Sequence, residues 1–373
     1  MNSFEAFFFI SWPFFMKKVR FSTSKRAFDS LYSRNNAYLC ARKRLMRQKK
    51  FFLTLLLVVG MASLTTAQTE STSVFNFLSL PSSSHAMALG GANVSLPDDD
   101  ASLFFQNPAL MSNVSDKSIN FSFLSYMQGC KVGNASWIKS HRERGTWGVG
   151  AQFVSYGSMR EMSVEGVELG EFSALDMAIS GGYSYALTEN LTGGAVGKFI
   201  YSKYGSYTSV ALAVDLGFNY WNDDENFFAS LVAANWGGQV KAFGDKRERL
   251  PMDLRLGFTK QLENAPIRFS VTFVDLLRWK SSDYYSTSGE LSNGRIFTNH
   301  IVLGVDIMPI DVFYISAGYS FRRAFELKAA GATHGAGLSF GAGFQLKRFN
   351  IGVAYAKYHV SMPALMVTAQ YHL

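Results

Sequence analysis

The chain has 373 residues, of which 48% are hydrophobic and 15% aromatic, and a formal net charge of +8. The positive charge is concentrated at the N-terminus, because residues 1–67 hold twelve of the 36 Lys and Arg but only two of the 28 Asp and Glu. The remainder is slightly acidic, which removes the basis for a nucleic-acid-binding function. It also holds a single cysteine, Cys130, so an intramolecular disulfide and a cysteine metal cluster are excluded there.

Residues 1–67 are predicted to be a leader. Basic residues precede the apolar stretch 51–62, and small residues follow it up to Ala67. This order is typical of a secretory signal peptide cleaved after Ala67, and the stretch is shorter than the roughly 20 apolar residues of a membrane helix. Met46 stands directly before the basic residues, so we expect translation to start there. The alternative is that residues 1–45 are a genuine extra leader.

Residues 68–117 form a second predicted segment without period-two alternation. Their prolines, their serine run and the pair Gly90-Gly91 favour turns and short helical pieces. Asn107-Pro108-Ala109 is a good helix start, because Asn can cap the helix and Pro fits its first turn. Asp98-Asp99-Asp100 could hold a hard cation, but it lacks the spacing of a calcium loop, and a solvated turn is the preferred interpretation.

From Ser118 onward, apolar and small or polar residues alternate. In the last segment Leu365, Val367, Tyr371 and Leu373 share one face of a strand on which the chain ends. Fourteen such strands are predicted: 118–126, 131–139, 145–156, 172–185, 191–202, 207–220, 227–235, 251–261, 267–277, 300–307, 312–321, 335–346, 349–358 and 363–373. Their length and even number predict an all-β fold, a transmembrane antiparallel β-barrel over residues 118–373.

The predicted connections separate by length. Every second one is short, namely 140–144, 186–190, 221–226, 262–266, 308–311 and 347–348. The others include four long loops: 157–171, 236–250, 278–299 and 322–334. Outer-membrane barrels place short turns in the periplasm and long loops outside, so we expect the N-terminal segment on the periplasmic side or in the lumen. A soluble β-sandwich would need shorter strands without this asymmetry, and a propeller would show a blade repeat.

The sequence contains no convincing catalytic constellation. Ser136 and Lys139 match the S-x-x-K of penicillin-recognising enzymes, but they lie in a predicted strand and the companion motifs are missing. The six histidines are scattered, without zinc spacing, and are predicted to lie on the surface or in loops. We therefore expect no enzyme activity, no cofactor and no metal.

One charged run stands in a predicted outer loop. It consists of Asp245, Lys246, Arg247, Glu248 and Arg249. The simpler interpretation is a solvated loop tip. The alternative is an electrostatic contact with an acidic glycan or a protein, which makes the run a candidate partner-binding site.

The segments LGGANVSLPDDDASLFFQNPALM, AQFVSYGSM and NWGGQVKAF carry a resemblance to a known family. The chain resembles the FadL-like outer-membrane superfamily and, within it, the PorQ-like proteins of the type IX secretion system. The resemblance implies a fourteen-stranded barrel whose segment 68–117 forms a plug or hatch. It also assigns a hatch motif to Gly90, Gly91, Asn107, Pro108 and Ala109. Leu373 departs from the family, in which many chains end in Phe.

The resemblance further implies a non-enzymatic role in a surface attachment complex. In that complex a PorQ-like barrel anchors a PorZ-like surface protein beside a PorU-like sortase and a PorV-like barrel, and cargo is attached to anionic lipopolysaccharide. The four long loops would then present the docking surface. The alternative, drawn from the FadL branch, is an outer-membrane channel for hydrophobic small molecules gated by the hatch.

Overall fold

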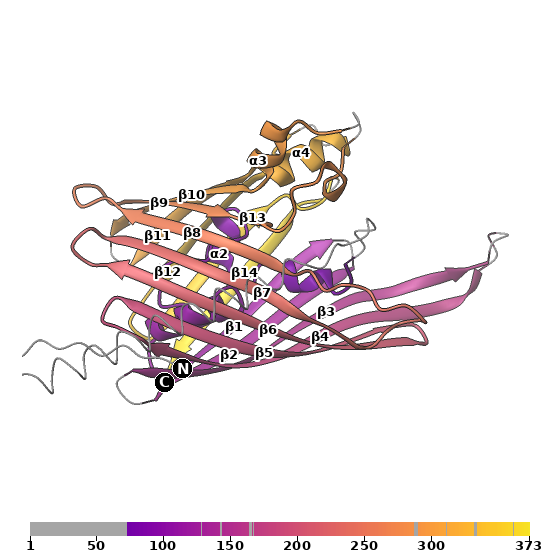
Figure 1. Ribbon diagram of the computed structural model, residues 1–373, viewed down its shortest axis with the longest axis horizontal. Coiled ribbons are helices and arrows are strands. Elements are labelled where there is room, and N and C mark those ends of the chain that lie inside the picture. The colour runs from indigo at the N-terminus through magenta and orange to yellow at the C-terminus, as the bar shows by residue number, and fades with distance from the viewer. Residues whose placement is uncertain are drawn as a thin grey trace, which may run out of the picture. The chain divides into compact units, whose positions relative to one another are not determined.

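The computed structural model describes residues 73–373 apart from 128, 142–143, 164–165, 167, 287–289, 311, 332–333 and 361. The leader, Met46 and the cleavage position after Ala67 lie outside the described residues. Within them, fourteen antiparallel strands follow one another around a closed barrel, and β1 pairs with β14 to complete it (Figure 1). The fold class predicted from the alternation is confirmed.

The strands differ in length around the barrel (Figure 1). In chain order they are β1 Ser118–Met127, β2 Cys130–His141, β3 Gly145–Met162, β4 Glu168–Ala186, β5 Leu191–Tyr204, β6 Tyr207–Asn222, β7 Phe227–Lys241, β8 Asp253–Gln261, β9 Ile267–Phe273, β10 Ile301–Ile310, β11 Phe313–Ser320, β12 Leu338–Gln345, β13 Phe349–Ala356 and β14 Ala364–His372. The strands from β3 to β7 are the longest.

Short helices occur before β1 and in two of the long connections. They are η2 Asn76–Ser79, α2 Ser84–Ala88, η3 Ala101–Phe105, η4 Pro108–Asn113, η5 Ser281–Asp283, α3 Asn293–Asn299 and α4 Phe321–Ala329. Among the described residues, no helix has both the length and the apolar character needed to span a bilayer.

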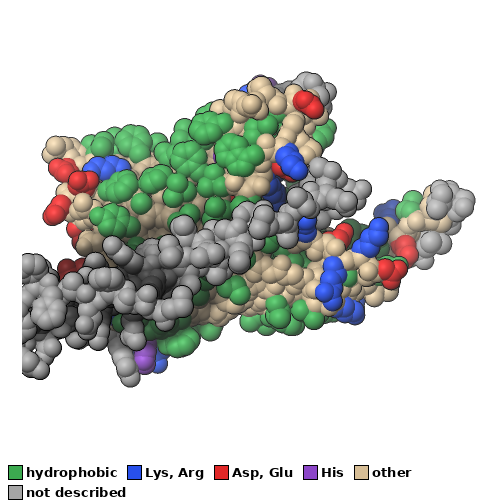
Figure 2. All heavy atoms as spheres, in the orientation of Figure 1, with side chains coloured by type: hydrophobic (Ala, Val, Ile, Leu, Met, Phe, Trp, Pro, Cys, Tyr) green, Lys and Arg blue, Asp and Glu red, His purple; other side chains and the backbone are tan. Residues whose placement is uncertain are grey.

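The outer face of the barrel is apolar. On β14, the side chains of Leu365 and Val367 are 48% and 40% exposed, whereas Met366 and Gln370 point inward and are buried. The other strands repeat this alternation, and apolar side chains cover much of the visible outer wall (Figure 2). Exposing so much apolar surface to water is unfavourable, so the outer wall matches a lipid environment.

All the long connections lie at one end of the strands, as the sequence predicts, and every connection at the other end is short. We call these ends the long-loop end and the short-turn end. Two of the predicted long loops are wrong in extent. Most of 157–171 is strand, since β3 and β4 continue as a paired hairpin, and β7 continues to Lys241 into 236–250. Polar residues on both faces hide such strands from a period-two pattern.

The segment before β1, residues 73–117, lies inside the barrel. The backbone N–H of Ser84 donates to Thr368 Oγ1 at 3.0 Å, and that of Ala101 donates to Gln370 Oε1 at 2.6 Å. On the other side of the bore, η4 packs against β3, β4, β5 and β6. We call residues 73–117 the hatch.

Candidate functional site

The bore is shaped to receive the hatch. The inward faces of several strands carry glycine where the hatch approaches most closely. A Cβ on Gly194 of β5 would lie 2.5 Å from the carbonyl carbon of Pro108, and one on Gly217 of β6 would clash with Asn107. Gly194 and Gly217 are cross-strand neighbours. The wall therefore opens a notch where any larger residue would exclude the hatch.

Asn107 shows why the hatch fits this notch. Its side-chain Oδ1 accepts a hydrogen bond from the Ala109 backbone at 2.9 Å and so caps η4. Its Nδ2 donates to the Val94 carbonyl at 2.7 Å and ties two parts of the hatch together. Pro108 occupies the first helical turn, where no backbone N–H is needed. The predicted helix start is thus a buried structural turn, and its residues bind the wall.

A buried charge cluster fixes the hatch to the wall on the other side. His85 of α2 lies between two carboxylates, with Nδ1 2.6 Å from Asp98 and Nε2 2.8 Å from Asp306 of β10. Arg268 of β9 reaches both carboxylates at 2.8 Å. Tyr314 stacks on the His85 ring, with centroids 3.9 Å apart. Since buried charges are stable only when paired and hydrogen-bonded, this cluster holds the hatch in one position.

Two sequence predictions are corrected by this cluster. Asp98 was expected in a solvated turn, but it is buried against Arg268. The histidines are predicted to lie on the surface or in loops. His300 does lie in the β9–β10 connection, where it is buried, whereas His85 is buried in α2 of the hatch. Arg268, the arginine partner of Asp98, lies far away along the chain, so no local pattern could reveal this pair.

The remaining candidate motifs have structural positions. Ser136 is buried on β2 and donates to the Ala101 carbonyl of the hatch, whereas Lys139 points outward, so the S-x-x-K residues do not meet. Among the described residues no cluster of His, Cys, Asp or Glu could hold a metal ion. The charged run Asp245–Arg249 is largely exposed. Its base is nevertheless fixed, because the Arg249 carbonyl accepts from the Val74 backbone of the hatch at 3.0 Å.

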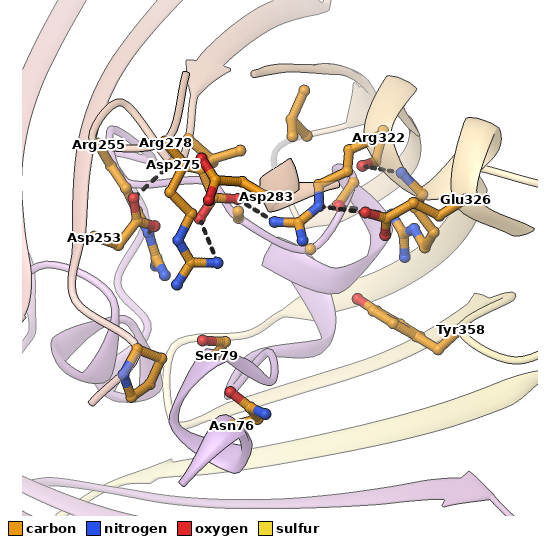
Figure 3. Close-up of a pocket in the computed structure, with 18 of the residues that line it drawn as sticks. Asn76, Ser79, Asp253, Arg255, Asp275, Arg278, Asp283, Arg322, Glu326 and Tyr358 are labelled. Atoms are coloured by element: carbon orange, nitrogen blue, oxygen red, sulfur yellow. Dashed lines mark hydrogen bonds and ion pairs between the residues drawn. The ribbon is translucent and has the colours of Figure 1, made fainter. Parts of the chain in front are cut away.

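A cavity of about 510 Å³ lies at the long-loop end, above the hatch (Figure 3). This volume is in the range of small-molecule sites. Gly90 and Gly91 form part of its floor, both with positive φ (101° and 96°). A Cβ on Gly91 would lie 2.5 Å from the Tyr358 hydroxyl, and one on Gly90 would clash with Val302. The glycine pair therefore lets the hatch turn close beneath the cavity.

The cavity is lined by charged side chains from the wall and the long loops (Figure 3). Four are arginines: Arg255, Arg278, Arg322 and Arg323. Four are acids: Asp253, Asp275, Asp283 and Glu326. No local pattern in the sequence marks this site, because its residues come from β8, the β9–β10 connection and α4, which only barrel closure brings together.

Ion pairs join most of these charges. Arg255 contacts Asp253 at 2.5 Å, and Arg322 contacts Asp275 at 2.5 Å and Glu326 at 2.9 Å. Burial alone would lower the pKa of Arg322, but Asp275 and Glu326 outweigh it and raise this pKa above its usual range. The cation at Arg322 is therefore permanent.

Arg323 differs from the other three arginines. Its Nη2 donates to the Gly90 carbonyl of the hatch at 2.7 Å, and its guanidinium lies 4.4 Å from the ring centroid of Tyr358. Within the described part of the chain, its Nε and Nη1 find no hydrogen-bond acceptor, and neither does the buried Tyr358 hydroxyl. These unpaired donors are buried beside the hatch floor, in residues that line the cavity.

A second void of about 20 Å³ lies deeper, between hatch and wall, beside His85 and Gln370. This is room for about one water molecule. The bore therefore changes from a solute-sized cavity at the long-loop end to close packing around the hatch.

Comparisons with solved structures identify the architecture. The Pseudomonas putida toluene transporter TodX is similar over 80% of this chain and 98% of its own, with a TM-score of 0.50 and 14% identity. The CymD monoaromatic hydrocarbon channel aligns over 80% of this chain and 97% of its own, at 12% identity and a TM-score of 0.49. No family model and no curated protein matches the chain. The likeness to TodX shows the fold alone, a closed β-barrel.

Proposed function

We propose that this protein is a non-enzymatic outer-membrane channel of the FadL-like type, which admits a small solute at its long-loop end and releases it past the hatch. The observation that carries the proposal is the cavity of about 510 Å³ floored by Gly90 and Gly91 of the hatch. Such a cavity is a natural receiving site, and the hatch beneath it is the barrier to passage. The similarity of the fold to that of the toluene transporter TodX supports a channel role.

In this proposal the long-loop end faces the exterior and the short-turn end faces the periplasm. The apolar outer wall places the barrel in the bilayer, and the closed ladder leaves no strand edge unpaired in lipid. Passage then requires the hatch to shift, because close packing fills the bore below the cavity.

The proposal is tested by fixing the hatch to the wall reversibly. Ser95 of the hatch and Thr259 of β8 are buried, with their hydroxyl oxygens 2.8 Å apart. In a Cys130→Ala background, the pair Ser95→Cys and Thr259→Cys should form a disulfide on oxidation. Solute flux into proteoliposomes should stop on oxidation and return on reduction. Each single cysteine variant serves as a matched control.

Two results would contradict the proposal. One is flux that is equal in the oxidised and reduced forms, which would contradict passage that depends on movement of the hatch. The other is an absence of flux through the reduced protein for toluene, glucose and glucuronate alike.

A second candidate function is the anchoring of a surface partner in an attachment complex, as the PorQ-like resemblance implies. The β3–β4 hairpin favours it, because its paired strands continue well beyond neighbouring parts of the wall (Figure 1). Near its end, the side chains of Arg160 and Glu168 are 74% and 53% exposed. Purification from detergent-solubilised outer membranes tests this role, since PorZ-like, PorV-like and PorU-like chains should then co-elute with the protein. A barrel that elutes alone would count against it.

A further inference from the structure

The cavity has the wrong chemistry for a hydrocarbon. Eight of its lining side chains are charged, and Ser73, Asn76 and Ser79 of the hatch add polar groups. An apolar solute would displace water from these groups without replacing its hydrogen bonds, which is unfavourable. A polar solute can replace them. The similarity to hydrocarbon channels therefore extends to the fold, and the lining of this cavity differs from the apolar site that a hydrocarbon needs.

The negative and positive side chains of the cavity differ in how they are paired. The carboxylates are occupied: Asp253 by Arg255, Asp275 by Arg278 and Arg322, and Glu326 by Arg322. Asp283 accepts a hydrogen bond from the Lys280 backbone at the start of η5. Arg323 has buried donors left over, since its Nε and Nη1 meet no acceptor among the described residues.

The Tyr358 hydroxyl lies close to the same part of the hatch as Arg323. It lies 2.5 Å from where a Cβ of Gly91 would be, and Arg323 Nη1 lies 3.9 Å from that point. Both groups are therefore gathered around one glycine of the hatch floor. A guanidinium and a phenol that share a site are suited to an oxyanion, because arginine presents a fork of donors that matches two oxygens and the phenol adds a third donor.

We propose that the cavity binds a small hydrophilic solute that bears an oxyanion, with the anion on Arg323 and Tyr358 above Gly91. This inference rests on the proposed channel, whose solute class it names. Occupation of the site would also contact the hatch, because Arg323 already donates to the Gly90 carbonyl. A solute that draws Arg323 toward itself would weaken a bond between the long-loop end and the hatch.

The test is equilibrium binding to the detergent-solubilised full barrel, measured by titration calorimetry. The probes are glucuronate, glucose 6-phosphate, glucose and toluene, which separate a carboxylate from a phosphate, a neutral sugar and a hydrocarbon. We expect at least one of the two anionic sugars to bind ten-fold or more tighter than glucose, since each charge-assisted hydrogen bond contributes about that factor. Binding should weaken as salt is raised.

Two variants locate the anion. Arg323→Gln should reduce the affinity for the preferred anion ten-fold or more and leave the affinity for glucose unchanged. Tyr358→Phe removes a single hydroxyl and should reduce the affinity for the preferred anion several-fold. Arg160→Gln, an exposed arginine of the β3–β4 hairpin, is the matched control and should have no effect. Retained β-sheet circular dichroism establishes that each variant is folded.

Tighter binding of toluene than of either anionic sugar would overturn the inference, as would equal binding of glucose and the anions or an unchanged affinity in both site variants. These outcomes do not contradict the proposed channel, because flux is measured separately in proteoliposomes. Anion binding without any flux would instead support the site and contradict the channel.

Discussion

The two ends of the bore are built from the same pair of components, the hatch and the barrel wall, and yet they differ in how their charged groups are paired. Around η4 and α2, the wall offers glycines to the hatch, and the charges of His85, Asp98, Arg268 and Asp306 are fully matched. At the long-loop end the same hatch floors a charged cavity with unused donors. The first arrangement suits a permanent seal, and the second suits exchange of a solute.

The largest expected effect comes from the charge cluster. Arg268→Leu leaves Asp98 and Asp306 with only His85 between them, and breaking a buried charge pair costs about 3–5 kcal/mol. The hatch should come loose from the wall, which limited proteolysis of the folded barrel would detect as cleavage within residues 73–117.

Arg160→Leu is the control for this change. In the wild type, the ion pair between Arg160 and Glu168 spans 3.9 Å between exposed side chains and should contribute at most about 1 kcal/mol to stability. Equal protease resistance of the two variants would show that the cluster does not seat the hatch.

The next largest effect tests the glycine notch. Gly194→Val places side-chain atoms against the Pro108 backbone, which cannot move aside as a flexible side chain could, and such overpacking costs about 1–3 kcal/mol. The hatch should be displaced, and ionic conductance in planar bilayers should rise above that of the wild type. Gly181→Val is the matched control, because nothing lies within 4 Å of its Cβ position. Conductance that rises equally in both variants would argue against a notch specific to the hatch.

A smaller effect is expected at the start of η4. Asn107→Ala removes the cap and the bond to Val94, and loss of a cap alone costs about 0.5–2 kcal/mol. Hydrogen exchange should become faster for the Ala109 and Leu110 amides while strand amides stay protected. Asn222→Ala is the control at the end of β6, where the partly exposed Asn222 side chain accepts from the Asp224 backbone. Unchanged exchange in the Asn107 variant would mean that the barrel wall alone holds this turn.

The alternation in the sequence was sufficient to predict the barrel, because a wall between lipid and lumen imposes period two on every strand. The last strand illustrates this, with Leu365 outward and Met366 inward. The alternation did not predict the full β3–β4 hairpin, since beyond the apolar wall both faces of Arg160–Met162 are exposed and polar residues no longer alternate with apolar ones.

The site could be predicted only in part. Gly90, Gly91 and Asn107 stand out locally, and the structure places the first two beneath the cavity and the third in the notch. The role of Arg323 depends on Tyr358 and Gly90, which reach it only when the barrel closes. Charged residues in loops look alike in a sequence whether they face solvent or a cavity.

The most direct measurement of the central claim, that the hatch is seated in the bore, is hydrogen exchange at two hatch amides in the detergent-solubilised protein. The Ser84 and Ala101 amides donate to side chains of β14, Thr368 and Gln370, and not to their own segment. Exchange at both should be as slow as in the barrel strands. Exchange at the rate of an unstructured peptide would place the hatch outside the bore and contradict the account.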